Sequence, residues 1–159
     1  MNSKIPTLLI VEDDENDFLF LENAIAHEKF ESKVHHACDG DQAIRYLAGE
    51  NDFADRVTHP LPGLIVLDLK LPGTDGFHVL QWIREHPAPG TLPAVILSSS
   101  QEPQDIERAF ALGAKAYLVK PSSPLRYPEV VQTLREFLLN GFNQTSAKNV
   151  VKTFNKHFA

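Results

Sequence analysis

Short apolar runs alternate with amphipathic stretches along this chain. Each run is four or five residues long, and four of the five end abruptly at charged or hydroxyl residues. Runs without strict alternation of apolar and polar positions are typical of strands in a parallel sheet that is covered on both faces. The predicted strands are residues 7–11, 33–37, 64–67, 94–97 and 116–119, of which the second is the weakest.

Between the runs, apolar residues recur at helical spacing. In the stretch 15–27, Phe18 and Ile25 fall on one helical face. A turn before the second helix offers Asp39 or Asp41 as its N-cap. The predicted helices are residues 15–27, a helix that contains residues 43–47, and residues 76–85, 103–112 and 128–139.

Strand and helix therefore alternate five times within 159 residues. This order predicts one α/β domain, an open, doubly wound parallel sheet of five strands with right-handed crossovers. Ligands of such sheets bind outside the carboxyl ends of the strands. The residues that directly follow each strand are thus the candidates for chemistry.

Those residues are mostly charged. Glu12 and Asp13 follow the first strand, Asp68 the third, Ser98 the fourth and Lys120 the fifth. Two carboxylates 4 Å apart repel by about 4 kcal/mol at an effective dielectric constant of about 20. A cation would relieve that repulsion, and a set of oxygen ligands with few protein groups favours Mg²⁺ over Ca²⁺ or a soft metal.

This set is also suited to phosphoryl transfer. Asp68 can act as the nucleophile, Lys120 and Mg²⁺ can neutralise the transferring oxygens, and Ser98 can donate a hydrogen bond to them. Taken singly, each residue has a plainer explanation as a solvated turn or a helix cap. The prediction rests on their occurrence together, each at the end of the appropriate strand.

Composition narrows the classes of partner and compartment. The net charge of −6 argues against nucleic acid as the main partner. No apolar run approaches the roughly 20 residues of a membrane-spanning helix, so we expect no membrane partner. Cys38 is the only cysteine, and residues 1–6 do not resemble a secretory signal. A cytoplasmic location is expected.

At these residues the chain resembles the receiver domains of response regulators. The matching stretches are residues 8–14, 64–76, 93–98, 109–114 and 116–121. The resemblance implies the flavodoxin-like receiver fold over residues 1–140. It implies a two-component phosphorelay, in which a histidine kinase or a histidine phosphotransfer protein is the partner. Such a receiver is no enzyme beyond catalysing its own phosphorylation and dephosphorylation.

The resemblance also implies a role for each site residue. Asp68 corresponds to the phosphoacceptor, and Lys120 to the lysine that contacts the phosphoryl group. Mg²⁺ ligands are implied at Asp13, Asp68 and the backbone carbonyl of Lys70, with Glu12 as the first acid of the pair. A further pair rearranges on phosphorylation in this family. The residues that match that pair are Ser98 and Tyr117.

The chain departs from the common pattern in three places. Glu12 stands where Asp is more frequent, and Ser98 where Thr is more frequent, both with the same chemistry. A long polar segment, residues 49–63, lengthens the spacing between Asp13 and Asp68. That segment, without an output domain in the sequence, is similar to the stand-alone regulators that pair with phytochrome-type kinases.

Two other functions compete with the phosphorylation switch. A pseudo-receiver would keep the fold and lose the chemistry, but Asp13, Asp68, Ser98 and Lys120 are all present. A phosphatase of the haloacid-dehalogenase type needs an acid two residues after its nucleophile, where this chain has Lys70. A DNA-binding regulator would need a further domain, and we expect none in the 19 residues after the last helix.

Residues 141–159 form a C-terminal extension of unusual composition. Val150, Val151, Phe154 and Phe158 recur at spacing that predicts a short helix. Three lysines and no acid give the extension a charge of +3, against −9 for the rest of the chain. We expect it to dock on its own domain, on a kinase, or on a second copy of the chain, where it would join helix 4, strand 5 and helix 5 in a homodimer.

Overall fold

The computed structural model describes residues 5–86, 92–141 and 150–154. Its strands are β1 (Thr7–Val11), β2 (Lys33–Ala37), β3 (Leu64–Leu67), β4 (Ala94–Ser98), β5 (Ala116–Val119) and β6 (Val150–Lys152). Its α-helices are α1 (Glu15–His27), α2 (Gly40–Ala48), α3 (Gly76–Glu85), α4 (Pro103–Ala111) and α5 (Tyr127–Asn140). Short 3-10 helices occupy Asn51–Phe53 and Pro124–Arg126.

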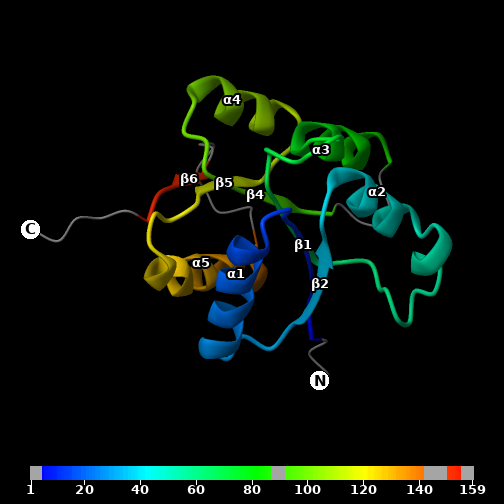
Figure 1. Ribbon diagram of the computed structural model, residues 1–159, viewed down its shortest axis with the longest axis horizontal. Helices are drawn as coiled ribbons and strands as arrows, with labels where there is room; N and C mark the ends of the chain where they lie inside the picture. Colours follow the sequence, from blue (N-terminus) through cyan, green and yellow to red (C-terminus); the bar gives the residue numbers. More distant parts are fainter. Residues whose placement is uncertain (1–4, 87–91, 142–149, 155–159) are drawn as a thin grey trace, which may run out of the picture.

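The described strands form one parallel sheet in the order β2-β1-β3-β4-β5-β6. Helices α1 and α5 cover one face, and α2, α3 and α4 cover the other (Figure 1). The predicted doubly wound parallel α/β fold is therefore confirmed. The sixth strand is an addition to the five that the sequence indicated.

Each strand supplies both layers of the core. In β1, Leu8 and Ile10 pack beneath α1 and α5, whereas Leu9 and Val11 pack beneath the other helices. Because alternate side chains of a strand point to opposite faces, a strand buried on both faces must be apolar throughout. That is why the strands appear in the sequence as unbroken apolar runs.

Aspartates begin three of the helices that follow strands. The side chains of Asp14, Asp39 and Asp75 accept hydrogen bonds from backbone N–H groups in the first turns of α1, α2 and α3. An N-cap of this kind satisfies one of the donors that a helix leaves free at its start. For α2 the cap is Asp39, one of the two candidates that the sequence offered.

The C-terminal extension corrects one prediction. Val150–Lys152 is not helical; it lies parallel to β5, with Val151 opposite Tyr117. β5 would otherwise leave an edge of unpaired backbone groups, and adjacent β-branched residues suit a strand better than a helix. Phe154 then turns into the core against α5 and is 2% exposed. Residues 142–149 and 155–159, with Phe158, lie outside the described residues.

The long segment between α2 and β3 is anchored by polar contacts. The guanidinium of Arg56 donates to the backbone oxygens of Tyr46, Leu47 and His59, at 2.8, 2.8 and 3.2 Å. The Tyr46 hydroxyl donates to the Pro60 oxygen at 2.7 Å. The segment thus closes back on the end of α2, at the far end of the sheet from the strand-end acids.

None of the helices in the described residues is long and apolar enough to cross a bilayer.

Candidate functional site

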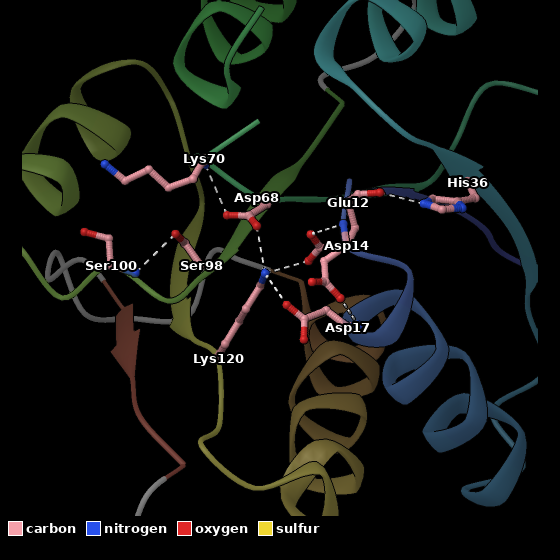
Figure 2. Close-up of polar contacts among 9 residues, drawn as sticks. All are labelled: Glu12, Asp14, Asp17, His36, Asp68, Lys70, Ser98, Ser100 and Lys120. Atoms are coloured by element: carbon pink, nitrogen blue, oxygen red, sulfur yellow. Dashed lines mark hydrogen bonds and ion pairs between the residues drawn. The ribbon is translucent and has the colours of Figure 1, made fainter. Parts of the chain in front are cut away.

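The carboxyl ends of three strands bring a buried lysine onto two buried acids. Lys120 follows β5, and its Nζ lies 2.7 Å from Glu12 Oε1 and 2.7 Å from Asp68 Oδ2 (Figure 2). The lysine side chain is 10% exposed and those of Glu12 and Asp68 are each 6% exposed. The sequence placed these residues at one edge of the sheet, and the structure brings them into direct contact.

A third acid on Lys120 was missed by the sequence analysis. Asp17 Oδ2 lies 2.8 Å from Lys120 Nζ and comes from the first turn of α1, where it is three residues beyond the N-cap Asp14 (Figure 2). The strand-end rule considers only the residues that directly follow a strand. The available signal was that the first turn of a helix after β1 faces the same edge of the sheet.

His36 was also missed. Its Nε2 donates to the backbone oxygen of Glu12 at 2.7 Å, and its ring stacks on Phe18 with a centroid separation of 3.7 Å. Because the acceptor is a carbonyl, this contact needs the proton on Nε2. His36 therefore fixes the backbone at the point where β1 leaves the sheet and the acids begin.

Burial and charge act in opposite directions on these groups. Burial raises the pKa of Glu12 to about 7; the hydrogen bond from Lys120 opposes this, and the charge of Asp68 adds to it. For Lys120, burial alone would lower the pKa, but the Asp68 charge and hydrogen bonds to Asp17, Asp68 and Glu12 raise it above its ordinary value. One ammonium thus serves several acids, and the cluster keeps an excess of negative charge.

That excess is placed where a divalent cation could bind. Ligand oxygens of Glu12, Asp13 and Asp68 lie within 4.8 Å of one another. Asp13 is exposed and its two neighbours are buried, so the group is open on one side. Carboxylate oxygens with an open side are compatible with a hard divalent cation that keeps part of its water shell.

The loop after Asp68 turns tightly around the acid. The Lys70 backbone N–H donates to Asp68 Oδ1 at 3.3 Å, while the Lys70 side chain points away from the acids toward α4 (Figure 2). A Cβ added at Gly76 would overlap the backbone oxygen of Asp68. Glycine at the start of α3 therefore lets this helix pack directly against the backbone that holds the carboxylate. A metal ligand role for the Lys70 carbonyl stays a prediction.

Ser98 on β4 and Tyr117 on β5 are both fully buried; Ser98 pairs with Val119, two residues beyond Tyr117 on the same strand. The Ser98 Oγ accepts a hydrogen bond from the Ser100 backbone N–H at 3.3 Å. The Tyr117 hydroxyl donates to the Ser100 backbone oxygen at 2.8 Å. Burial raises the pKa of Tyr117, and hydrogen bonding to Ser100 and Ser98 opposes that shift. The predicted switch pair is thus connected through Ser100.

Comparison with known proteins gives one consistent family. The model of the response regulator receiver domain matches residues 8–132. FilR2, a probable methanogenesis regulatory protein of Methanothrix harundinacea, is 29% identical over 87% of this chain and 86% of its own length. Response regulator Rcp1 of Synechocystis is 28% identical, over 83% of this chain and 88% of its own.

Solved structures agree in fold and extent. Response regulator RPA3017, from red light signalling in R. palustris, superimposes with a TM-score of 0.79 at 34% identity, covering 86% of this chain and 96% of its own. The phosphorylated cyanobacterial phytochrome response regulator RcpA has a TM-score of 0.79 at 29% identity, covering 90% and 98%. A matching family model, the shared fold and the buried lysine–acid site lead to one conclusion: this chain belongs to the response regulator receiver domain family.

Proposed function

We propose that this chain is a stand-alone phosphorylation switch that accepts a phosphoryl group on Asp68. The observation that carries the proposal is the Asp68 carboxylate, held 2.7 Å from the Lys120 ammonium beside the acids Glu12 and Asp13. The charge of a single buried acid would be neutralised by the lysine alone. Three converging carboxylates, two of them in contact with Lys120, are what a cation-assisted phosphoacceptor requires.

The donor in this proposal is a phosphohistidine of a histidine kinase or a phosphotransfer protein. Asp68 attacks phosphorus through a carboxylate oxygen; the new O–P bond forms as the N–P bond of the phosphohistidine breaks. The leaving imidazole keeps the electron pair of that bond and takes a proton from water. Lys120, fixed by Glu12 and Asp17, stays beside Asp68 to contact an incoming phosphoryl oxygen.

Mg²⁺ is the cation we assign to the acids. Glu12, Asp13 and Asp68 would hold it with the backbone carbonyl of Lys70, and it would neutralise charge on the transferring oxygens. The all-oxygen donor set fits this ion. A Mn²⁺-bound form is known for Rcp1, which supports the binding of a divalent cation by this chain.

The output is a change of the surface around α4, β5 and α5. The Ser98 hydroxyl would donate to the phosphoryl group. Tyr117 is already buried, and its hydrogen bond to the Ser100 oxygen is the contact that a movement of Ser98 would affect. A ligand shifts such an equilibrium only by its difference in affinity for the two states. This surface, with β6 now beside β5, is where we expect a partner or a second copy of the chain to bind.

The kinase we favour is of the phytochrome type. RcpA is described as a phytochrome response regulator, and RPA3017 as acting in red light signalling. We expect the exchange to take place in the cytoplasm.

The test is phosphorylation of Asp68→Asn. Acetyl phosphate with Mg²⁺ should add one phosphoryl group to the wild-type chain, measured by intact mass, and none to Asp68→Asn. Asp52→Asn, an exposed acid far from the strand ends, is the matched control and should be phosphorylated normally. An unmodified wild-type chain with both acetyl phosphate and a kinase would favour the pseudo-receiver; an unchanged adduct on Asp68→Asn would reject the site.

A further inference from the structure

Ser100 joins both members of the switch pair to the start of α4. Its backbone N–H donates to Ser98 Oγ at 3.3 Å, and its carbonyl accepts from the Tyr117 hydroxyl at 2.8 Å. Its own hydroxyl donates to Asp105 Oδ2 at 2.6 Å and accepts from the Glu102 backbone N–H at 3.3 Å. The bond to the carboxylate is the shortest of the four, as expected when the acceptor is charged.

Asp105 stands in the first turn of α4, and its side chain is 19% exposed. The Asp105 carboxylate also pairs with Lys70, whose Nζ is 3.5 Å from Oδ2. The Lys70 side chain is 65% exposed, so solvent weakens that ion pair. The contact with Ser100 is therefore the main restraint on the Asp105 carboxylate.

α4 depends on this contact more than its neighbours do. Its N-cap residue, Glu102, makes no capping hydrogen bond with its side chain within the described structure. Among the residues of α4, all of them described, only Ala109 is buried, whereas α5 buries five. A helix with little buried surface is held weakly and can shift at low cost. The Ser100–Asp105 hydrogen bond satisfies no backbone donor of α4, but it ties the first turn of the helix to the loop that precedes it.

We propose that Asp105 is a positioning residue of the switch: by holding Ser100, it ties the first turn of α4 to the segment that carries Ser98 and contacts Tyr117. The inference rests on the proposed phosphorylation of Asp68 and specifies how its effect reaches the surface. When the Ser98 hydroxyl turns to a phosphoryl oxygen, Ser100 moves with it. While Asp105 holds Ser100, the first turn of α4 must move with Ser100. Without Asp105, the loop between β4 and α4 changes conformation and α4 stays in place.

The experiment compares α4 backbone amide shifts by NMR with and without beryllofluoride and Mg²⁺, a phosphoryl mimic. The variants are Asp105→Ala, Ser100→Ala and the double variant. Asp41→Ala is the matched control, because Asp41 in the first turn of α2 accepts a hydroxyl hydrogen bond of the same 2.6 Å length, from Thr74, away from the switch pair. Asp105→Asn keeps an acceptor oxygen but no charge.

We expect beryllofluoride to bind every variant, while the α4 shift changes in Asp105→Ala fall to about half of the wild-type size or less. Ser100→Ala should show the same loss, and the double variant no more than either, because both remove one contact. Asp105→Asn should recover part of the response. The inference would be overturned if the α4 shift changes in Asp105→Ala were as large as in the wild type. It would also be overturned if Asp41→Ala reduced them as much as Asp105→Ala does. A wild-type chain that fails to respond would instead overturn the proposed function.

Discussion

At the residue scale, the chemistry of the site depends on how many acids one lysine serves. Lys120 Nζ contacts Glu12, Asp17 and Asp68, each within 2.8 Å. Buried charges cost free energy unless they are paired, and the pairing here comes from three separate elements. The lysine therefore offsets the cost of burying these acids in the native fold.

Replacing Lys120 should consequently destabilise the protein. We expect Lys120→Met to lower the free energy of unfolding by about 3 kcal/mol, because it leaves buried acids without their cation. For a chain of this size that corresponds to a fall in Tm of about 6–12 °C. Lys115→Met, at an exposed position just before β5, is the matched control. If calorimetry shows equal small losses for both variants, the buried ion pairs contribute little to stability.

At the element scale, β6 changes how the C-terminal extension is understood. It covers the edge of β5, the strand that carries Tyr117, and it delivers Phe154 to the core beside Val130 and Leu134 of α5. The Lys152 Nζ donates to Thr133 Oγ1 at 3.1 Å, which adds a polar contact between strand and helix. The extension is thus part of the packed domain at residues 150–154.

The Phe154 side chain should contribute most of the free energy that holds residues 150–154 on the domain. Phe154→Ala removes a side chain that is 2% exposed, and we expect a loss of about 3 kcal/mol of unfolding free energy. Val151→Ala, on the same segment but 46% exposed, is the control and should cost well under about 1 kcal/mol. Denaturant unfolding of both variants measures the difference. Similar midpoints would mean that the extension does not hold to the domain in solution.

His35, which lies against the segment after α2, should make the stability of the fold depend on pH. The His35 ring lies 5.8 Å from that of His59 and 5.4 Å from that of Tyr46. Burial lowers the pKa of His35 below its ordinary value of 6.5, and the charges of His59 and Lys33 lower it further. The unfolded chain therefore binds the His35 proton first, and folding is disfavoured as the pH falls below about 6.5.

Replacing His35 should remove that contribution. Urea unfolding of wild type and His35→Gln between pH 8 and 5 should show a steeper loss of stability in the wild type as the pH falls through about 6.5, levelling off below the lowered folded pKa. At pH 8, where His35 is neutral in both states, the difference between the two proteins should be independent of pH. Parallel curves over the whole range would contradict the lowered pKa.

At the scale of the whole molecule, the acidic cluster proposed to hold a cation exists only when the sheet is assembled. Asp13 follows β1 and Asp68 follows β3, 55 residues later in the sequence, and their oxygens converge only because these strands are neighbours. A cation that binds the native state and not the unfolded chain stabilises folding. Binding of Mg²⁺ is therefore measurable as thermal stability.

Mg²⁺ at ten times its dissociation constant should stabilise the wild type by about 1.4 kcal/mol. Asp13→Asn should reduce this gain, because it removes one ligand, and should raise the Tm of the metal-free protein, because it relieves repulsion. Thermal scans across a Mg²⁺ titration test both effects. An unchanged Mg²⁺ dependence in Asp13→Asn would exclude this residue as a ligand.

Patterns in the sequence were enough to predict five of the six strands, the five α-helices, the parallel sheet and most of the site. Apolar runs of strand length and apolar residues at helical spacing are local patterns in the sequence. Because the sheet is buried on both faces, its strands are apolar throughout and are easily recognised. Residues that follow parallel strands must meet at one edge, so Glu12, Asp13, Asp68 and Lys120 could be grouped without a structure. The structure confirmed their convergence.

The remaining contacts could not be predicted from local patterns in the sequence. Asp17 reaches Lys120, and His36 reaches the Glu12 backbone, because α1 and β2 lie beside β1 at that edge. The extension pairs as a strand because the β5 edge is available to it, although its apolar spacing also fits a helix. Each of these contacts joins segments that are distant in sequence, and local periodicity carries no information about which distant edge or side chain a segment will meet.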